Sequence, residues 1–247
     1  MSDVLVVANR KGGTAKTTTV VNLAYALSER GARVLVIDLD NQGHVEFGFS
    51  AGDAQSAQLS MPDWLSSFEE FKGVFCYSDN IQLVLAHTNS AFDESAYKLD
   101  RFSSMFDAIS STNQFDIILV DTPPTLGPRL LSALAGANKI VIPAEPTPLA
   151  SDGVNKLLNA CMKAIQNKHF RATTIDILPV MVDGKLRIHR QTLGLWQQKF
   201  GGGRILPAIR RNVKVAEAFA VHLPVSEYAP LSAGAENYRC LCDRLFS

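Results

Sequence analysis

A glycine-rich turn near the beginning of the chain, between an apolar run and an amphipathic segment, constrains the fold more than any other feature. The run from Val4 to Ala8 predicts a buried strand, and apolar residues recur with helical spacing from about Thr17 to Arg30. The turn between them has the sequence Lys11-Gly12-Gly13-Thr14-Ala15-Lys16-Thr17-Thr18. Small residues at a helix start let backbone N–H groups approach phosphate oxygens, and the helix N-terminus adds positive potential. The turn therefore predicts a phosphate site.

The side chains of this turn match one form of nucleotide-binding loop and not another. The common pattern GxxxxGK followed by Ser or Thr is absent, because Arg10 and Ala15 stand where it has glycine. The pattern KGGxxK followed by Ser or Thr is present, with Lys11 as a second lysine at its start. Lys16 is expected to neutralise the β- and γ-phosphates, and the Thr17 hydroxyl to bind Mg²⁺. The alternative is an ordinary glycine turn before a helix.

Two more apolar runs end in acidic residues. Val34 to Ile37 precedes Asp38 and Asp40, and Ile117 to Val120 precedes Asp121. Carboxylates at the carboxyl ends of parallel strands lie where open α/β sheets bind ligands. A carboxylate after four apolar residues is the Walker B arrangement, which binds Mg²⁺ directly or through water. For the first pair, the alternative is a solvated turn with one helix-capping aspartate.

These motifs resemble those of the ParA/MinD family of deviant Walker ATPases. Asp38 to Gly43 resembles the family's DxDPQG switch, and Phe115 to Pro124 resembles its hhhhDxPP segment. Four later segments also resemble the family: Lys139 to Pro143, Leu178 to Asp183, Arg211 to Ala218 and Ser232 to Tyr238. The last two resemble the ParA patterns RNVRLxEA and SxGAExY, which favours the ParA-like branch. The resemblance covers nearly the whole chain and is weakest at residues 44 to 110.

The resemblance implies an ATPase that uses ATP and Mg²⁺ and turns over slowly. Three residues would be catalytic: Lys11, which crosses a dimer interface to the partner's ATP, Lys16, and Asp40, which positions the attacking water. Thr17, Asp38 and Asp121 would form the metal site. The expected nucleotide-binding residues are Lys11, Gly12, Gly13, Thr14, Ala15, Lys16, Thr17, Thr18, Met181, Arg211 and Asn212.

Three positions depart from the family pattern. Ala15 stands where glycine is usual, and Asn41 and Arg210 stand where proline is usual. Alanine at position 15 is strained if the backbone there needs a positive φ, and costs little otherwise. These departures keep open a second hypothesis, in which the chain is a nucleotide-gated binding scaffold with negligible hydrolysis.

Basic residues are concentrated in one stretch, although the whole chain has 24 basic and 24 acidic residues. Lys185 to Lys214 contains basic residues and no acidic ones, which suggests an anion-binding face. The resemblance implies binding to DNA without sequence preference, and Lys214 matches the family's DNA-contact arginine. The DNA-binding candidates are Lys185, Arg187, Arg190, Arg211 and Lys214, with Arg204 and Arg210 as further basic residues. The alternative is a solvated surface with ordinary counterions.

The remaining apolar runs predict the rest of the fold. Further strands are expected at Ile81 to Ala86, Lys139 to Ile142, Ile175 to Met181 and Arg204 to Ile209, and helices at about Ser151 to Lys168 and about Gly234 to Phe246. Continuous apolar strands that alternate with helices indicate an α/β fold with a doubly wound, mostly parallel sheet and helices on both faces. We expect residues 1–247 to form a single P-loop NTPase domain.

Composition argues against several other classes of protein. The chain has no run of 18 apolar residues and its N-terminus lacks a signal-peptide core, so we expect a cytoplasmic protein. Its four cysteines form no CxxC pair, which argues against a zinc site, and they are poorly placed for the bridged cluster of a nitrogenase-reductase relative. A MinD-like division-site regulator remains an alternative, but the last segment, from Tyr238 to Ser247, carries only Arg239 and Arg244 and does not resemble a basic membrane helix.

The resemblance also implies partners. An ATP-dependent homodimer would bind nucleoid DNA, and a ParB-like or cargo-adaptor protein would stimulate hydrolysis. The cargo would be a plasmid, a chromosome region or a protein body such as a microcompartment. Because the chain starts directly at its first strand, we expect no operator-binding extension. Because its last segment does not resemble a basic membrane helix, we expect no membrane association.

Overall fold

The computed structural model describes residues 2–49, 57–60, 62–65, 68, 71–86, 98–166 and 170–246. Its strands are β1 (Asp3–Val7), β2 (Val34–Asp38), β3 (Ala57–Gln58), β4 (Phe71–Ser78), β5 (Ile81–Ala86), β6 (Ile117–Asp121), β7 (Lys139–Ala144) and β8 (Thr174–Pro179). Its α-helices are α1 (Lys16–Ser28), α2 (His44–Phe47), α3 (Arg101–Ser111), α4 (Pro128–Gly136), α5 (Pro148–Gln166), α6 (Arg187–Phe200), α7 (Val213–Ala220), α8 (Val225–Tyr228) and α9 (Ala233–Phe246). Short 3₁₀ helices cover Asp63–Leu65 and Gly202–Arg204. The last two residues of the helix predicted over 151 to 168 lie outside the described residues.

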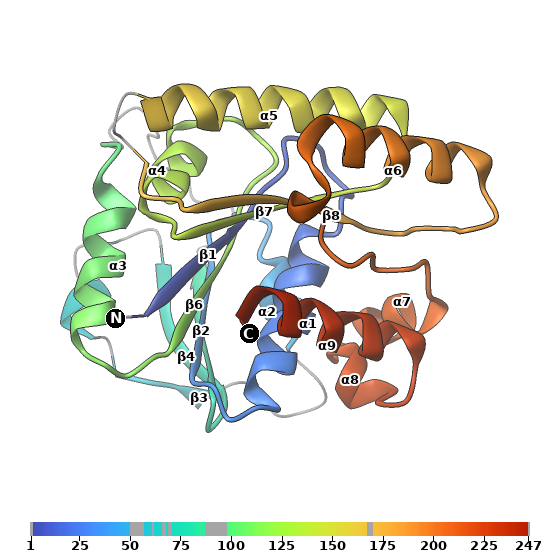
Figure 1. Ribbon diagram of the computed structural model, residues 1–247. Helices are drawn as coiled ribbons and strands as arrows, with labels where there is room; N and C mark the ends of the chain where they lie inside the picture. Colours follow the sequence, from blue (N-terminus) through green and yellow to red (C-terminus); the bar gives the residue numbers. More distant parts are fainter. Residues whose placement is uncertain are drawn as a thin grey trace.

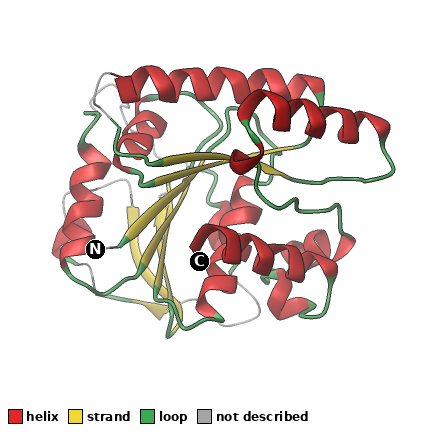
Figure 2. Ribbon diagram, in the orientation of Figure 1, coloured by secondary structure: helices red, strands yellow, loops and turns green. Residues whose placement is uncertain are grey.

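The described strands form one sheet in the order β3-β4-β5-β2-β6-β1-β7-β8. The six strands from β5 to β8 in this order are parallel, and β3 and β4 add an antiparallel edge. Helices cover both faces: α3, α4 and α5 lie on one side and α1 and α9 on the other (Figure 1), with the strands as a layer between them (Figure 2). The predicted fold class, a doubly wound and mostly parallel sheet, is confirmed.

The apolar core is divided between the two faces of the sheet. Val4 and Val6 of β1 pack into one buried cluster, whereas Leu5 and Val7 pack into the other. Successive side chains of a strand point to opposite faces, so a central strand that is covered on both sides must be apolar at every position. This is why β1 appears in the sequence as a continuous apolar run.

The carboxyl ends of three central strands lie together at one edge of the sheet. Val7 of β1 and Asp38 of β2 both lie beside Asp121 of β6 in the strand register. The glycine-rich turn leaves β1 at the same edge and continues into α1. The sheet therefore brings the turn and both aspartate motifs together.

One predicted strand is wrong. The segment from Arg204 to Ile209 makes only isolated parallel bridges, in which Ile205 lies opposite Ile177 and Arg210 opposite Val182. Pro207 has no N–H group to donate to a strand ladder, so the pairing beside β8 is interrupted. The segment follows β8 as an irregular connection that leads to α7.

Candidate functional site

The glycine-rich turn is held in shape by its own backbone and by Asn9. The Asn9 side chain donates to Pro143 O at 2.7 Å and accepts from the Lys11 N–H at 3.1 Å. The Thr14 hydroxyl donates to Lys11 O at 3.1 Å, and Gly13 has a φ of +69°. The turn is thus a fixed cradle anchored to β7 through a buried amide. Sequence reasoning missed Asn9, because its partner is 134 residues away.

Lys16, Thr17 and Asp121 form the polar centre of the site. The Thr17 hydroxyl donates to Asp121 Oδ2 at 2.6 Å, across the gap between α1 and β6. Lys16 is buried, and its Nζ donates to Lys11 O at 3.5 Å. Burial lowers the pKa of the Lys16 ammonium, an effect that the nearby Asp121 and Asp40 carboxylates oppose. The ammonium is therefore held beside the cradle, in the field of two carboxylates.

The aspartates at the end of β2 and just after it have different surroundings. Asp38 is fully buried, and its carboxylate accepts from the backbone N–H groups of Asp40 at 2.9 Å and Val45 at 3.3 Å. Burial and the adjacent Asp121 charge raise the pKa of Asp38 well above its usual value. Asp40 accepts from the Gln42 N–H at 3.1 Å and faces the hollow above the turn. Asp38 thus shapes the loop that presents Asp40, and its metal-binding role stays a prediction.

Two hollows beside the turn join into one groove. The first is lined by Gly12, Gly13, Thr14, Ala15, Lys16, Thr17, Thr18, Asp40, Gln42, His44, Pro124 and Phe219. The second is lined by Ala15, Thr18, Val180, Met181, Ile209, Arg210, Arg211, Asn212, Val215, Ala216, Phe219 and Tyr238. They share Ala15, Thr18 and Phe219, so a polar end that fits phosphates continues into an apolar end that fits a nucleobase.

Except for Lys11, the predicted nucleotide-binding residues line this groove. Met181, Arg211 and Asn212 line the apolar end, although they follow the turn by more than 160 positions in the sequence. Phe219 also lines the groove, and nothing in the sequence pattern pointed to it. Tyr238, in the closing SxGAExY segment, is buried beside it. Lys11, at the start of the turn, is exposed and lines neither hollow.

The oxygen atoms at the site fit Mg²⁺. Mg²⁺ is bound in nucleotide sites by one or two protein oxygens together with phosphate oxygens and water, rather than by an all-protein cage. The Thr17 hydroxyl and the Asp121 carboxylate supply two adjacent oxygens beside the cradle. Asp121 is buried away from water, which raises the pKa of its carboxyl group. A bound cation would compensate the carboxylate for this lost hydration. In the described part of the chain, no group of three or more His, Cys, Asp or Glu side chains could hold a metal by itself.

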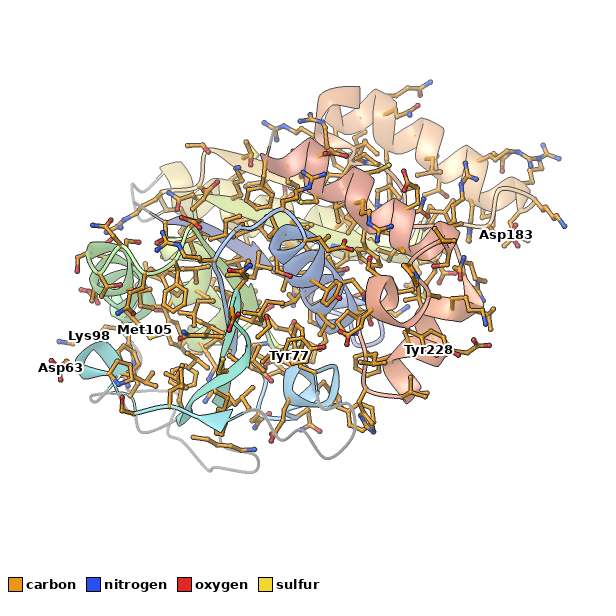
Figure 3. All side chains as sticks on the ribbon, turned by 90° about the horizontal axis from the view of Figure 1, so that it is seen from below. Asp63, Tyr77, Lys98, Met105, Asp183 and Tyr228 are labelled. Carbon is orange, nitrogen blue, oxygen red and sulfur yellow. The ribbon has the colours of Figure 1, made fainter. Side chains whose placement is uncertain are left out.

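The basic residues predicted to bind DNA are exposed and belong to two elements. Lys185, Arg187 and Arg190 lie at or just before the start of α6, and Arg211 and Lys214 lie at the start of α7. Asp183, in the loop that precedes α6, lies at the end of the molecule opposite Lys98 (Figure 3).

Three of these five cations are already held by neighbours. Arg211 pairs with Glu145 at 3.1 Å and Lys214 with Glu217 at 2.7 Å. Arg190 donates to Gly184 O at 2.7 Å. The structure gives Lys185 and Arg187 no acidic partner among the described residues, so these two are the most available to an anion.

The fold and the site define a P-loop nucleotide hydrolase, and comparisons with known proteins identify its family. Residues 2–175 match the family described as an AAA domain. The chromosome-partitioning ATPase Soj of Thermus thermophilus is 31% identical over 243 residues, which are 98% of this chain and 95% of that protein. The chain belongs to the ParA/MinD family of P-loop ATPases.

Solved structures of this family have the same fold. The complex of a McdA variant with ATP from Cyanothece superposes with a TM-score of 0.81 at 19% identity, covering 99% of this chain and 96% of that one. The septum site-determining protein MinD with Mg-ADP from Pyrococcus horikoshii gives 0.76 at 18% identity, covering 100% and 97%. The chain is thus an ATPase of the class that includes partition and positioning proteins. None of its described helices has the length and apolar character needed to cross a membrane.

Proposed function

We propose that this chain binds ATP and Mg²⁺ in the groove beside the glycine-rich turn and hydrolyses ATP as the timer of a partition or positioning system. The observation that carries the proposal is the convergence of Lys16, Thr17, Asp40 and Asp121 at the carboxyl edge of the sheet, beside a hollow that fits a base. Its similarity to the chromosome-partitioning ATPase Soj supports the biological role.

Each residue of the site has a separate task in this proposal. Backbone N–H groups of Gly12 to Lys16 bind the phosphates, and Thr17 with Asp121 holds Mg²⁺, which neutralises the β- and γ-phosphate charge when bound. The Lys16 ammonium stabilises charge that develops on the transferred phosphoryl group. Asp40 accepts a hydrogen bond from the attacking water and so orients it.

A second subunit completes the site. Lys11 is exposed at the start of the turn and lines neither hollow of its own subunit, which leaves its side chain available to a partner. In the proposed dimer, the two grooves face each other and Lys11 contacts the phosphates of the partner subunit's ATP. ATP binding then favours the dimer, and hydrolysis releases it.

DNA and a stimulating protein are the proposed partners of the dimer. Lys185, Arg187, Arg190, Arg211 and Lys214 would neutralise phosphates of nucleoid DNA without reading its sequence. A ParB-like or cargo-adaptor protein would raise the slow hydrolysis rate and so release the dimer from the nucleoid locally. The cargo is a plasmid, a chromosome region or a protein body.

Substitution of Lys16 tests the nucleotide site directly. Lys16→Ala removes the ammonium that faces the phosphates, so ATP affinity should fall at least about a hundredfold, as expected for loss of a buried charge contact. Binding of a fluorescent ATP analogue measures this change. Lys156→Ala, at an exposed lysine on α5, is the matched control and should bind ATP as the wild type does. Equal affinity in the two variants would contradict the proposed site.

A further inference from the structure

Phe219 of α7 joins the two ends of the nucleotide groove. It lines the apolar hollow that contains Met181 and also the polar hollow that contains Lys16 and Asp40. A base in the apolar hollow would therefore contact the same ring that closes the phosphate end. A nucleotide bound in the groove would therefore restrict the orientation of the Phe219 ring.

The other side of Phe219 packs on the short helix α2. Its ring centroid lies 5.5 Å from that of Phe47, at an interplanar angle of 44°. A Cβ atom at Gly48 would lie 3.3 Å from Phe219 Cε2 and 2.6 Å from Val21 Cγ2, so α2 approaches both α7 and α1 closely. Among the described residues, Phe47 lines neither hollow. It can therefore respond to a nucleotide only through its neighbours.

His222 also contacts Phe47. Its ring meets the Phe47 ring edge-on with centroids 3.9 Å apart, and its Nδ1 lies 2.9 Å from Phe47 O. His222 has a φ of +63°, the left-handed conformation common at the residue after a helix C-cap, and its N–H donates to Phe219 O at 3.1 Å as α7 ends. The end of α7 therefore places the His222 ring against Phe47 of α2.

Helix α2 is continuous with the loop that presents Asp40. The Gly43 N–H donates to Asp40 O at 3.0 Å, and the Val45 N–H donates to the Asp38 carboxylate at 3.3 Å. Glu46 of α2 pairs with Lys72 of β4 at 2.7 Å, which anchors the helix to the antiparallel edge of the sheet. A displacement of Phe47 would thus be transmitted to Asp40 through fewer than ten residues of hydrogen-bonded backbone.

We propose that Phe219, Phe47 and His222 form a positioning contact through which the nucleotide base sets the loop that carries Asp40. The base then contributes to the rate of hydrolysis and not only to affinity, although it lies at the other end of the groove from the reacting phosphate. Phe47 and His222 are positioning residues, since they act through Phe219 and α2 and do not line the groove. This inference rests on the proposed nucleotide site.

Amide hydrogen exchange with Mg-ADP tests this contact on the full chain without relying on activity. In the wild type, ADP should slow exchange both in residues 11–18 and in residues 44–48. In Phe47→Leu, the slowing of exchange in residues 11–18 should remain, whereas the slowing in residues 44–48 should decrease roughly two- to tenfold. This factor corresponds to the free energy contributed by one aromatic pair. His222→Gly removes the second ring at a position whose φ suits glycine and should give the same result.

Steady-state kinetics supplies a second readout. In both variants kcat should fall roughly two- to tenfold, whereas KM for ATP changes less than about twofold, because the lost contact acts on Asp40 and not on binding. Leu231→Ala removes a fully exposed apolar side chain in the segment between α8 and α9 and is the matched control. It should leave both the exchange pattern and kcat unchanged.

The outcomes separate this inference from the proposed function. Retention of the full slowing at 44–48 and of kcat in both variants would overturn the positioning contact. Slowing at 11–18 without slowing at 44–48 in the wild type would overturn it too and leave the nucleotide site standing. If ADP slows neither segment in the wild type, the nucleotide site itself is wrong, and the positioning contact falls with it.

Discussion

At the scale of single residues, Ala15 has a backbone conformation that suits glycine better than alanine. It caps the start of α1 with φ and ψ of 61° and 31°. Its carbonyl accepts hydrogen bonds from the Thr19 N–H at 2.9 Å and the Thr19 hydroxyl at 2.7 Å, which hold the turn in this shape. An L-residue in this region costs roughly 1 kcal/mol or more relative to an ordinary conformation. The turn therefore carries backbone strain at the proposed phosphate site.

Replacement of this alanine should stabilise the protein. Ala15→Gly should raise the free energy of unfolding by about 1 kcal/mol, because glycine adopts a positive φ without steric cost. Urea denaturation measures the change. Ala26→Gly, in the same helix but with ordinary helical geometry, is the control and should lower stability by about 1 kcal/mol. A loss of stability in both variants would show that Ala15 is not strained.

The sequence predicted the polar residues of the site better than its apolar walls. Lys16, Thr17 and Asp121 could be placed because their types and spacing are imposed by phosphate and metal chemistry over a few consecutive residues. The φ of Ala15 could not, since it depends on the hydrogen bonds that the folded turn makes. Phe219 could not either, because one aromatic residue in an amphipathic helix is ordinarily a core residue.

At the scale of elements, the parallel strands were predictable and the irregular connections were not. Strands such as β1, β2 and β6 are buried on both faces, so their apolar runs are continuous and end abruptly at functional residues. The connection after β8 has a comparable apolar content, but Pro207 and the preceding glycines prevent a regular ladder. Leu206 and Ile209 still donate to β8, but the missing donor at Pro207 breaks the ladder, so apolar content was not enough to make a strand.

The start of α6 is the element whose charge most directly tests DNA binding. Lys185→Glu combined with Arg187→Glu should weaken binding to DNA, because both cations are exposed and lie outside the nucleotide groove. The slope of log K against log salt should decrease by about 2, as expected for the loss of two phosphate contacts. Titration of a labelled duplex at several salt concentrations measures it.

The control for this variant carries the same change in charge at a different place. Lys98→Glu combined with Lys156→Glu alters two exposed lysines of the loop before α3 and of α5, and Lys98 lies at the opposite end of the molecule from the loop before α6 (Figure 3). Its salt dependence should stay close to that of the wild type. If the two double variants lose affinity equally, DNA is attracted by net charge and not by α6.

At the scale of the whole molecule, the side edge of the sheet differs from the carboxyl ends of its parallel strands in what it carries. The antiparallel strands β3 and β4 form one side edge of the sheet, where Lys72 of β4 pairs with Glu46 of α2, whereas the carboxyl ends of the parallel strands carry the glycine-rich turn and both aspartate motifs. In the proposed dimer, a second subunit would lie against these carboxyl ends and cover the groove.

The most direct test of this account is the mass of the Asp40→Ala variant in solution with Mg-ATP, measured by light scattering during gel filtration. Asp40 lines the polar hollow, and loss of its proposed role in orienting the attacking water should trap the ATP-bound form. A dimer of twice the chain mass should then appear with ATP and a monomer without it. Addition of Lys11→Ala should return the protein to a monomer that still binds ATP, whereas addition of Arg10→Ala, at the exposed neighbouring cation, should leave the dimer intact. A protein that binds ATP and remains monomeric in every variant would contradict the account.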